Sequence, residues 1–127
     1  MELVIYDQET NEEYARTLLH PEDTFSVEWI HSVEKTKWKE KLEVNEEGKI
    51  ILIETSFKSY GSGVPNQKKG KVHIKDGYVI MTDFYEEKEK YQWIHSHNAN
   101  FEIKKNNQSF LKTKDIPHHH KAEIIIE

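Results

Sequence analysis

Apolar and polar residues alternate with a period of two along most of the chain, the pattern of extended strands with one buried face. The clearest example spans 38–44. Gly, Asn and Asp residues punctuate the alternation, roughly every 8 to 15 residues. Among these signals, Asp76-Gly77 predicts a tight hairpin between strands 71–74 and 78–84, because Asp-Gly tolerates the positive φ of a two-residue turn.

The alternating segments amount to about nine or ten short strands. Only 86–92 has a composition that would suit a helix, and it lacks an apolar stripe. Many short strands predict an all-β fold, either an antiparallel β-sandwich or a partly closed barrel. The chain has 127 residues, so we expect a single β-domain over 1–127; the pattern does not predict the order of its strands.

Composition excludes several classes of protein. The formal net charge of −5 disfavours nonspecific binding to nucleic acid or to an anionic membrane. The chain contains no cysteine, which excludes disulfides, thiolate catalysis and Cys-ligated metal centres. Its longest aliphatic run, 50–53, is far shorter than the ~20 residues that cross a bilayer. Because the sequence starts abruptly in a strand-like pattern, we expect that a segment upstream of Met1 has been removed.

A histidine and a carboxylate are predicted to share the inward face of two neighbouring strands. Lysines occupy alternate positions of 37–41, so Trp38 and Glu40 turn toward the core. In the preceding strand His31 lies on the apolar face, and a hairpin would bring it opposite or diagonal to Glu40. A buried carboxylate needs a partner, and an imidazole supplies one. The pair either fixes the hairpin register or, with Glu34 at the rim, forms a general base or a divalent-metal site.

The stretch 59–65 contains Gly61 and Gly63 followed by Pro65, which predicts a tight loop. It lacks the lysine of a phosphate-binding loop. The serine between the two glycines abuts a glycine on each side, unlike the serine of a nucleophile elbow. We interpret the loop either as a rigid strand connection or as a binding loop that presents its amides or Tyr60 beside the predicted histidine site.

Three consecutive histidines precede the last predicted strand, 122–126. Because neighbouring residues of a strand face opposite ways, at most His118 and His120 could bind one metal together. His95 and His97 have the same spacing. The histidines alone do not decide whether the protein binds a metal.

The tetrapeptide Trp-Ile-His-Ser occurs at 29–32 and again at 93–96. Aligning the two copies does not align the apolar positions that follow, so the repeat is no duplicated domain, and we expect only the first copy to matter for function. Within the first copy, His31 and Ser32 would point apart in a strand. With no convincing Ser-His-Asp pattern, we predict a protein that is not an enzyme and that needs no cofactor.

Two groups of motifs resemble the bacterial domain-of-unknown-function family eighteen-fifty: His31-Ser32-Val33-Glu34 with Trp38-Lys39-Glu40, and the run from Phe57 to Pro65. The match extends to both ends of the chain, including Ile116-Pro117-His118-His119. The candidate binding residues within these motifs are His31, Ser32, Glu34, Trp38, Glu40, Tyr60, Gly61, Gly63, Pro65, His118 and His119.

The resemblance implies a small exported or membrane-anchored β-domain, often encoded beside TAXI-type TRAP transporters, which are secondary carriers fed by a solute-binding protein. We therefore expect an extracytoplasmic, non-catalytic accessory domain that contacts a transporter subunit or its solute-binding protein, and that is held at the membrane through the removed N-terminal segment. The resemblance implies that this segment is a hydrophobic signal or anchor. The alternative is a domain that binds a small ligand or a divalent metal through the His/Glu site. A third option is that every motif is core architecture.

Overall fold

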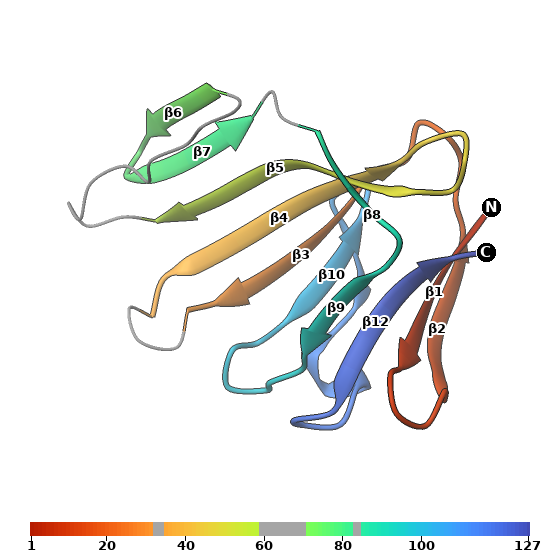
Figure 1. Ribbon diagram of the computed structural model, residues 1–127. Helices are drawn as coiled ribbons and strands as arrows, with labels where there is room; N and C mark the ends of the chain where they lie inside the picture. The colour runs from red at the N-terminus through yellow and green to blue at the C-terminus, as the bar shows by residue number, and fades with distance from the viewer. Residues whose placement is uncertain (32–34, 59–70, 83–84) are drawn as a thin grey trace.

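The computed structural model describes residues 1–31, 35–58, 71–82 and 85–127, and these residues form an all-β fold (Figure 1). They contain twelve strands and one turn of 3-10 helix, and no α-helix occurs among them. The strands are β1 (Glu2–Asp7), β2 (Glu13–Leu18), β3 (Phe25–Ile30), β4 (Lys37–Val44), β5 (Ile50–Lys58), β6 (Lys71–Lys75), β7 (Tyr78–Thr82), β8 (Glu86–Lys88), β9 (Tyr91–Ile94), β10 (Glu102–Lys105), β11 (Gln108–Leu111) and β12 (Lys121–Ile126), and the 3-10 turn is Thr113–Asp115.

The strands form two antiparallel sheets, which confirms the predicted sandwich and not the barrel. The smaller sheet has the order β2-β1-β12-β9, and the larger one has the order β11-β10-β3-β4-β5-β7-β6, with β8 paired to the start of β5. The central strands of the smaller sheet, β1 and β12, come from the two ends of the chain. The centre of this sheet therefore forms only when the two ends of the chain pair with each other.

The hydrophobic core lies between the two sheets. Leu3 of β1 and Ile124 of β12 belong to the smaller sheet, while Phe25, Val27 and Leu42 belong to the larger one, and all five are almost completely buried. Complete burial of such a side chain contributes roughly 1.5–3 kcal/mol. Alternation supplies these residues because every second side chain of a strand points to the same face.

A bulge changes the face that β5 presents to the core. Alternation predicts that Ile51, Ile53 and the later odd-numbered residues of this strand share one face. Instead, the pairing with β4 shifts around Ile53, which is the extra residue of a β-bulge. Ile50 and Leu52 therefore belong to the core cluster in the first half of the strand, while Phe57 pairs with the inward-facing Trp38 in the second half.

The number of strands exceeds the expected nine or ten. One addition is β8, which lies within the segment that could have suited a helix and pairs with β5. A strand of three residues is too short to show alternation in the sequence. It is recognised in the structure by its backbone pairing with β5. The Asp76-Gly77 hairpin is confirmed, with φ values of 52° and 81° at its two turn residues. No helix that is long and apolar enough to span a membrane occurs in the part of the chain described here.

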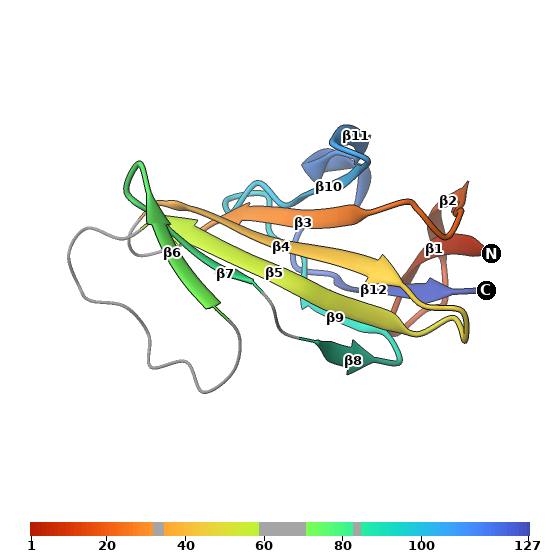
Figure 2. The same ribbon diagram turned by 90° about the horizontal axis from the view of Figure 1, so that it is seen from above.

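The larger sheet extends past the smaller one. Seen from above, the β6–β7 hairpin and the adjoining ends of β4 and β5 lie beyond the strands of the smaller sheet (Figure 2). This part of the sheet includes the pairs Trp38–Phe57 and Phe57–Val79. An aromatic part of the inner face is thereby placed at the end of the sandwich.

Candidate binding site

The β3–β4 hairpin carries the inward-facing residues that the alternation predicted. Its register pairs Trp29 with Trp38, Val27 with Glu40, and Phe25 with Leu42. Residues that are directly opposite in an antiparallel pair have side chains on the same face. The prediction that Trp38, Glu40 and Leu42 turn toward the apolar face of β3 is therefore confirmed.

The expected meeting of His31 and Glu40 is wrong. The backbone amide of His31 donates to the carbonyl of Thr36 at 2.7 Å, and the register places Val27, four residues before His31, opposite Glu40. The tighter hairpin leaves Trp38 between the two groups, and the His31 ring stacks on Trp38 with 5.3 Å between ring centroids. Alternation fixes the face of a residue, but the hairpin connection fixes its partner.

Four aromatic side chains form a continuous row across the inner face of the larger sheet; we call Phe101, Trp29, Trp38 and Phe57 the aromatic row. Neighbouring ring centroids lie 5.5, 6.3 and 4.5 Å apart, and their planes are inclined by only 19°, 27° and 18°. The ring planes are therefore roughly parallel along the row, and no ring presents its edge to the face of the next. Aromatic edges carry the positive part of the ring quadrupole, so they favour electron-rich groups.

Two buried polar atoms in the described part of the hairpin lack hydrogen-bond partners. Among the described residues, the buried Oγ1 of Thr36 and Nε1 of Trp38 make no hydrogen bond, and Thr36 is only 4% exposed. An unpaired polar atom in such a position costs about 1–3 kcal/mol, and native proteins contain few of them. Both atoms belong to the β3–β4 hairpin, which carries Trp29 and Trp38 of the aromatic row, and both can donate to an acceptor.

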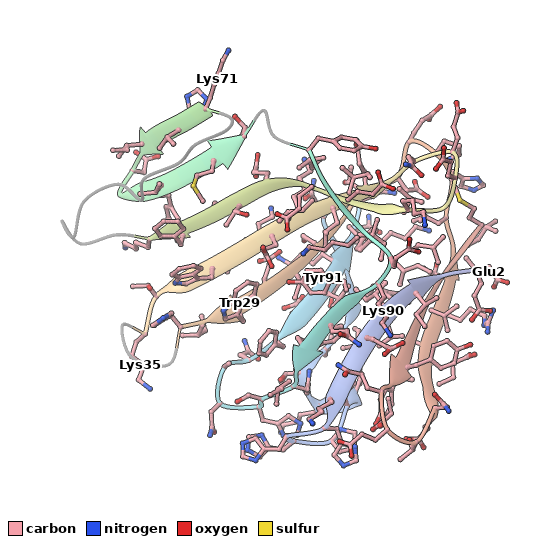
Figure 3. All side chains as sticks on the ribbon, viewed as in Figure 1. Glu2, Trp29, Lys35, Lys71, Lys90 and Tyr91 are labelled. Carbon is pink, nitrogen blue, oxygen red and sulfur yellow. The ribbon has the colours of Figure 1, made fainter. Side chains whose placement is uncertain are left out.

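Glu40 is paired across the sandwich instead of with His31. The hydroxyl of Tyr91, on β9 of the smaller sheet, donates to Glu40 Oε1 at 2.5 Å. Trp29 and Tyr91 are marked in Figure 3 on β3 and β9, one on each sheet. Burial, together with the nearby Glu40 charge, raises the pKa of Tyr91 well above its ordinary value. The carboxylate thus joins the two sheets beside the aromatic row.

Other candidate residues from the sequence lie outside the described residues: Ser32, Glu34, Tyr60, Gly61, Gly63 and Pro65. The described strands nevertheless show where these segments begin. The register places Ile30, Lys37 and Lys58 at the same end of the larger sheet, because β3 and β5 both run antiparallel to β4. The two groups of family-like motifs thus leave the described strands at the end that carries the aromatic row.

The three histidines near the C-terminus do not share one set of contacts. They lie in a turn and not in a strand, with His119 at a positive φ of 67°. His118 Nδ1 accepts the amide of His97 at 3.0 Å, and the His119 ring stacks on His118. His120 instead contacts Asp7. The premise that His118 and His120 point the same way is therefore wrong, and no group of three or more His, Asp or Glu side chains within the described ranges is arranged to hold a metal ion.

A buried carboxylate that the sequence analysis missed lies beside His120. Asp7 is 2% exposed and accepts from the amides of Glu9 and Thr10, from Tyr14 Oη at 2.8 Å and from His120 Nδ1 at 2.8 Å. The amide of Thr10 and the hydroxyl of Tyr14 hold the pKa of the Asp7 carboxyl well below its ordinary value. Asp7 thereby fastens the β1–β2 turn to the segment that leads into β12.

The second Trp-Ile-His-Ser copy contributes two buried side chains, Trp93 and His95, while its Ile94 is 60% exposed. Trp93 Nε1 donates to His95 Nδ1 at 3.1 Å, so the proton of this buried imidazole is on Nε2, which donates to the carbonyl of Thr113. Burial lowers the pKa of His95, which keeps the ring neutral. Both ring nitrogens of His95 thus have hydrogen-bond partners within the domain.

Sequence reasoning missed Asp7, Tyr14 and Tyr91. Their partners are far away in the chain: 113 positions separate Asp7 from His120, and 51 separate Glu40 from Tyr91. Alternation predicts a short strand over 91–94, which includes Tyr91, but it carries no signal for a contact between sheets. The polar stretch Glu9-Thr10-Asn11-Glu12, which follows Asp7 closely, predicted only a turn.

Comparison with known proteins identifies a family but no activity. The family model described as "Domain of unknown function (DUF1850)" matches residues 25–111, which span the chain from β3 to β11. No curated protein and no solved structure gives a significant match. The matched region contains the aromatic row, Thr36 and the Glu40–Tyr91 pair. The chain belongs to the DUF1850 family of domains of unknown function.

Proposed function

We propose that this chain is a non-catalytic binding domain that acts outside the cytoplasm as an accessory component of a TAXI-type TRAP solute transport system. The observation that carries the binding role is the pair of unpartnered polar atoms, Thr36 Oγ1 and Trp38 Nε1, beside the aromatic row. The transport context comes from the resemblance to a family whose members are often encoded beside such transporters.

The chemistry of the site suits an acceptor-rich protein segment. The indole N–H of Trp38 and the hydroxyl of Thr36 can each donate one hydrogen bond, and the ring edges beside them attract carbonyl or carboxylate oxygens. A partner that supplies two oxygen acceptors would relieve the cost of leaving these atoms unpaired. These groups bind and orient; the described part of the site offers donors and rings rather than a nucleophile held against a base.

The proposal is tested by the affinity of the purified domain for the solute-binding protein and for the membrane subunits of a TAXI-type TRAP system from the same genome. Thr36→Val keeps the shape of the side chain and removes its hydroxyl, so we expect about tenfold weaker binding. Thr17→Val on β2, on the other sheet, is the matched control and should bind like the wild type. If the wild-type domain binds no component, or if Thr36→Val binds equally well, the proposal fails.

The location outside the cytoplasm needs its own test. The full-length protein, produced in its native bacterium, should be degraded when protease is added to intact spheroplasts. A cytoplasmic marker protein should survive the same treatment. Protection of both proteins would contradict an extracytoplasmic location.

A further inference from the structure

The outer face of the larger sheet has a hollow that belongs to neither the core nor the aromatic row. It measures about 290 Å³ and is lined by Glu28, Lys37, Lys39, Ser56, Tyr78, Lys104 and Asn107. Its residues come from β3, β4, β5, β7 and β10 and from the turn after β10, so it spans the width of the sheet. A volume at the lower end of the range for ligand pockets suits a small ligand.

The charge of the hollow is opposite to that of the chain. Three lysines and one glutamate line it, whereas the whole chain carries −5. A fourth ammonium group, Lys58 Nζ, lies 6.0 Å from the centre of the Tyr78 ring at its wall. Among acidic neighbours, Glu102 is directly opposite Glu28 in the register but does not line the hollow. An excess of positive charge in a concave site concentrates anions.

Glu28 sets the geometry of two of these lysines. Its side chain is only 9% exposed, and its two carboxylate oxygens lie 3.6 Å from Lys37 Nζ and 3.4 Å from Lys104 Nζ. The hydroxyl of Ser26 also donates to it at 3.3 Å. The buried Glu28 carboxylate thus holds one ammonium group at each of its two oxygens. Together, Glu28 and the two lysines carry a net charge of +1.

Lys39 supplies the charge that Glu28 does not bind. It lies directly opposite Glu28 in the register, and within the described ranges it makes no ion pair. Ser56 is its neighbour on β5, so a hydroxyl lies beside the third ammonium group. Lysine acts as a point charge toward an anion, in contrast to the planar fork that arginine offers to a carboxylate. Three ammonium groups around one hollow match the three terminal oxygens of a phosphoryl group.

We propose that this hollow binds a phosphoryl group with two negative charges, either as inorganic phosphate or as a phosphomonoester headgroup of a lipid. Lys37, Lys39 and Lys104 supply the charge, and the hydroxyl groups of Ser56 and Tyr78 donate to the oxygens. This site is independent of the aromatic row, which lies on the opposite face of the same sheet.

The test measures binding of inorganic phosphate by calorimetry, and binding to phosphatidylcholine vesicles with and without phosphatidic acid. Lys39→Gln should weaken phosphate binding on the order of fivefold. Lys41→Gln is the matched control, because Lys41 lies two positions along on the same face of β4 but does not line the hollow. Glu28→Gln should tighten binding severalfold, because it frees two lysines from a competing charge while keeping the shape of the side chain.

Opposite effects of Lys39→Gln and Glu28→Gln support the site, since loss of folding would weaken binding in both variants. Circular dichroism melting checks that the variants fold. Binding of vesicles with phosphatidic acid but not of free phosphate would assign the lipid as the source of the phosphoryl group. The proposal is overturned if the wild type binds neither probe, if Lys41→Gln weakens binding as much as Lys39→Gln, or if a folded Glu28→Gln variant binds more weakly.

Discussion

The hydroxyl of Tyr91 on the smaller sheet donates to the carboxylate of Glu40 on the larger sheet at 2.5 Å, and this contact joins the two layers beside the aromatic row. Tyr91 is 7% exposed, so its hydroxyl has left water. Removing the tyrosine hydroxyl leaves the half-buried Glu40 carboxylate without this hydrogen bond, which costs free energy because water replaces the donor only in part.

Tyr91→Phe is expected to lower the free energy of unfolding by about 1–3 kcal/mol, because it leaves Glu40 without this donor. Urea denaturation with an unchanged m value is the appropriate measurement. Tyr85→Phe serves as the control: Tyr85 is 64% exposed, and its hydroxyl accepts a solvent-exposed hydrogen bond from the Asn45 side chain. Equal stabilities of the two variants would show that the bond between the sheets contributes nothing.

The raised pKa of Tyr91 also predicts that the free energy of unfolding falls at alkaline pH. In the unfolded chain tyrosine loses its proton near pH 10, whereas the folded protein holds it to higher pH. The unfolded state then binds fewer protons, so stability falls as pH rises above about 10. The fall should be smaller in Tyr91→Phe, as measured by unfolding at successive pH values between about 9 and 11. An identical alkaline limb in both proteins would contradict the burial of this hydroxyl.

The lowered pKa of Asp7 predicts that the protein loses stability in acid. Because hydrogen bonds to the carboxylate depress the pKa of Asp7 in the folded state, the unfolded chain takes up a proton first as pH falls. The stabilisation is complete above the unfolded value of about 4 and is lost progressively below it. Asp7→Asn should lower stability at pH 7 by about 2 kcal/mol and should flatten the acid limb. Glu46→Gln, in an exposed turn, should leave stability within about 0.5 kcal/mol of the wild type.

The fold class could be predicted from alternation, and the partners of most polar groups could not. The stretch 38–44 gave the inward face of β4 correctly, because the period of a strand is a local property. The pairing of Glu40 with Tyr91 and of Asp7 with His120 depends on how two sheets stack, which no local pattern encodes. The bulge at Ile53 shifted the face of β5 by one residue, and nothing in the sequence marks it.

The positions of the candidate residues in the strands could be predicted in part. Trp38 and Glu40 were chosen for their inward positions, and both lie where the alternation placed them. The error was the register: a hairpin pairs its strands through the geometry of its turn, and the pairs that formed separate His31 from Glu40 by one aromatic ring. The family resemblance marks residues of the same hairpin, because its motifs follow chain segments and not strand pairings.

Removing the Thr36 hydroxyl is predicted to have opposite effects on stability and on binding. In the free domain Oγ1 is buried without a described partner, so Thr36→Val should raise the free energy of unfolding by about 1 kcal/mol. Chemical denaturation compared with the wild type measures this; Thr17→Val, which removes a hydroxyl that accepts from Lys105 Nζ at 3.3 Å, should instead lower the free energy of unfolding. A loss of 1 kcal/mol or more would mean that the hydroxyl already has a partner within the domain, and the binding role of Thr36 would then be abandoned.

The indole N–H groups report on the proposed site most directly, because the chain has only three tryptophans. In a ¹⁵N-labelled domain, addition of the purified TAXI-type solute-binding protein should shift the side-chain resonance of Trp38, whose Nε1 is unpartnered. The resonance of Trp93, already bonded to His95, should stay in place as the internal control. A Trp38 resonance that does not move at saturating amounts of the solute-binding protein or of the membrane subunits would contradict the proposed binding site.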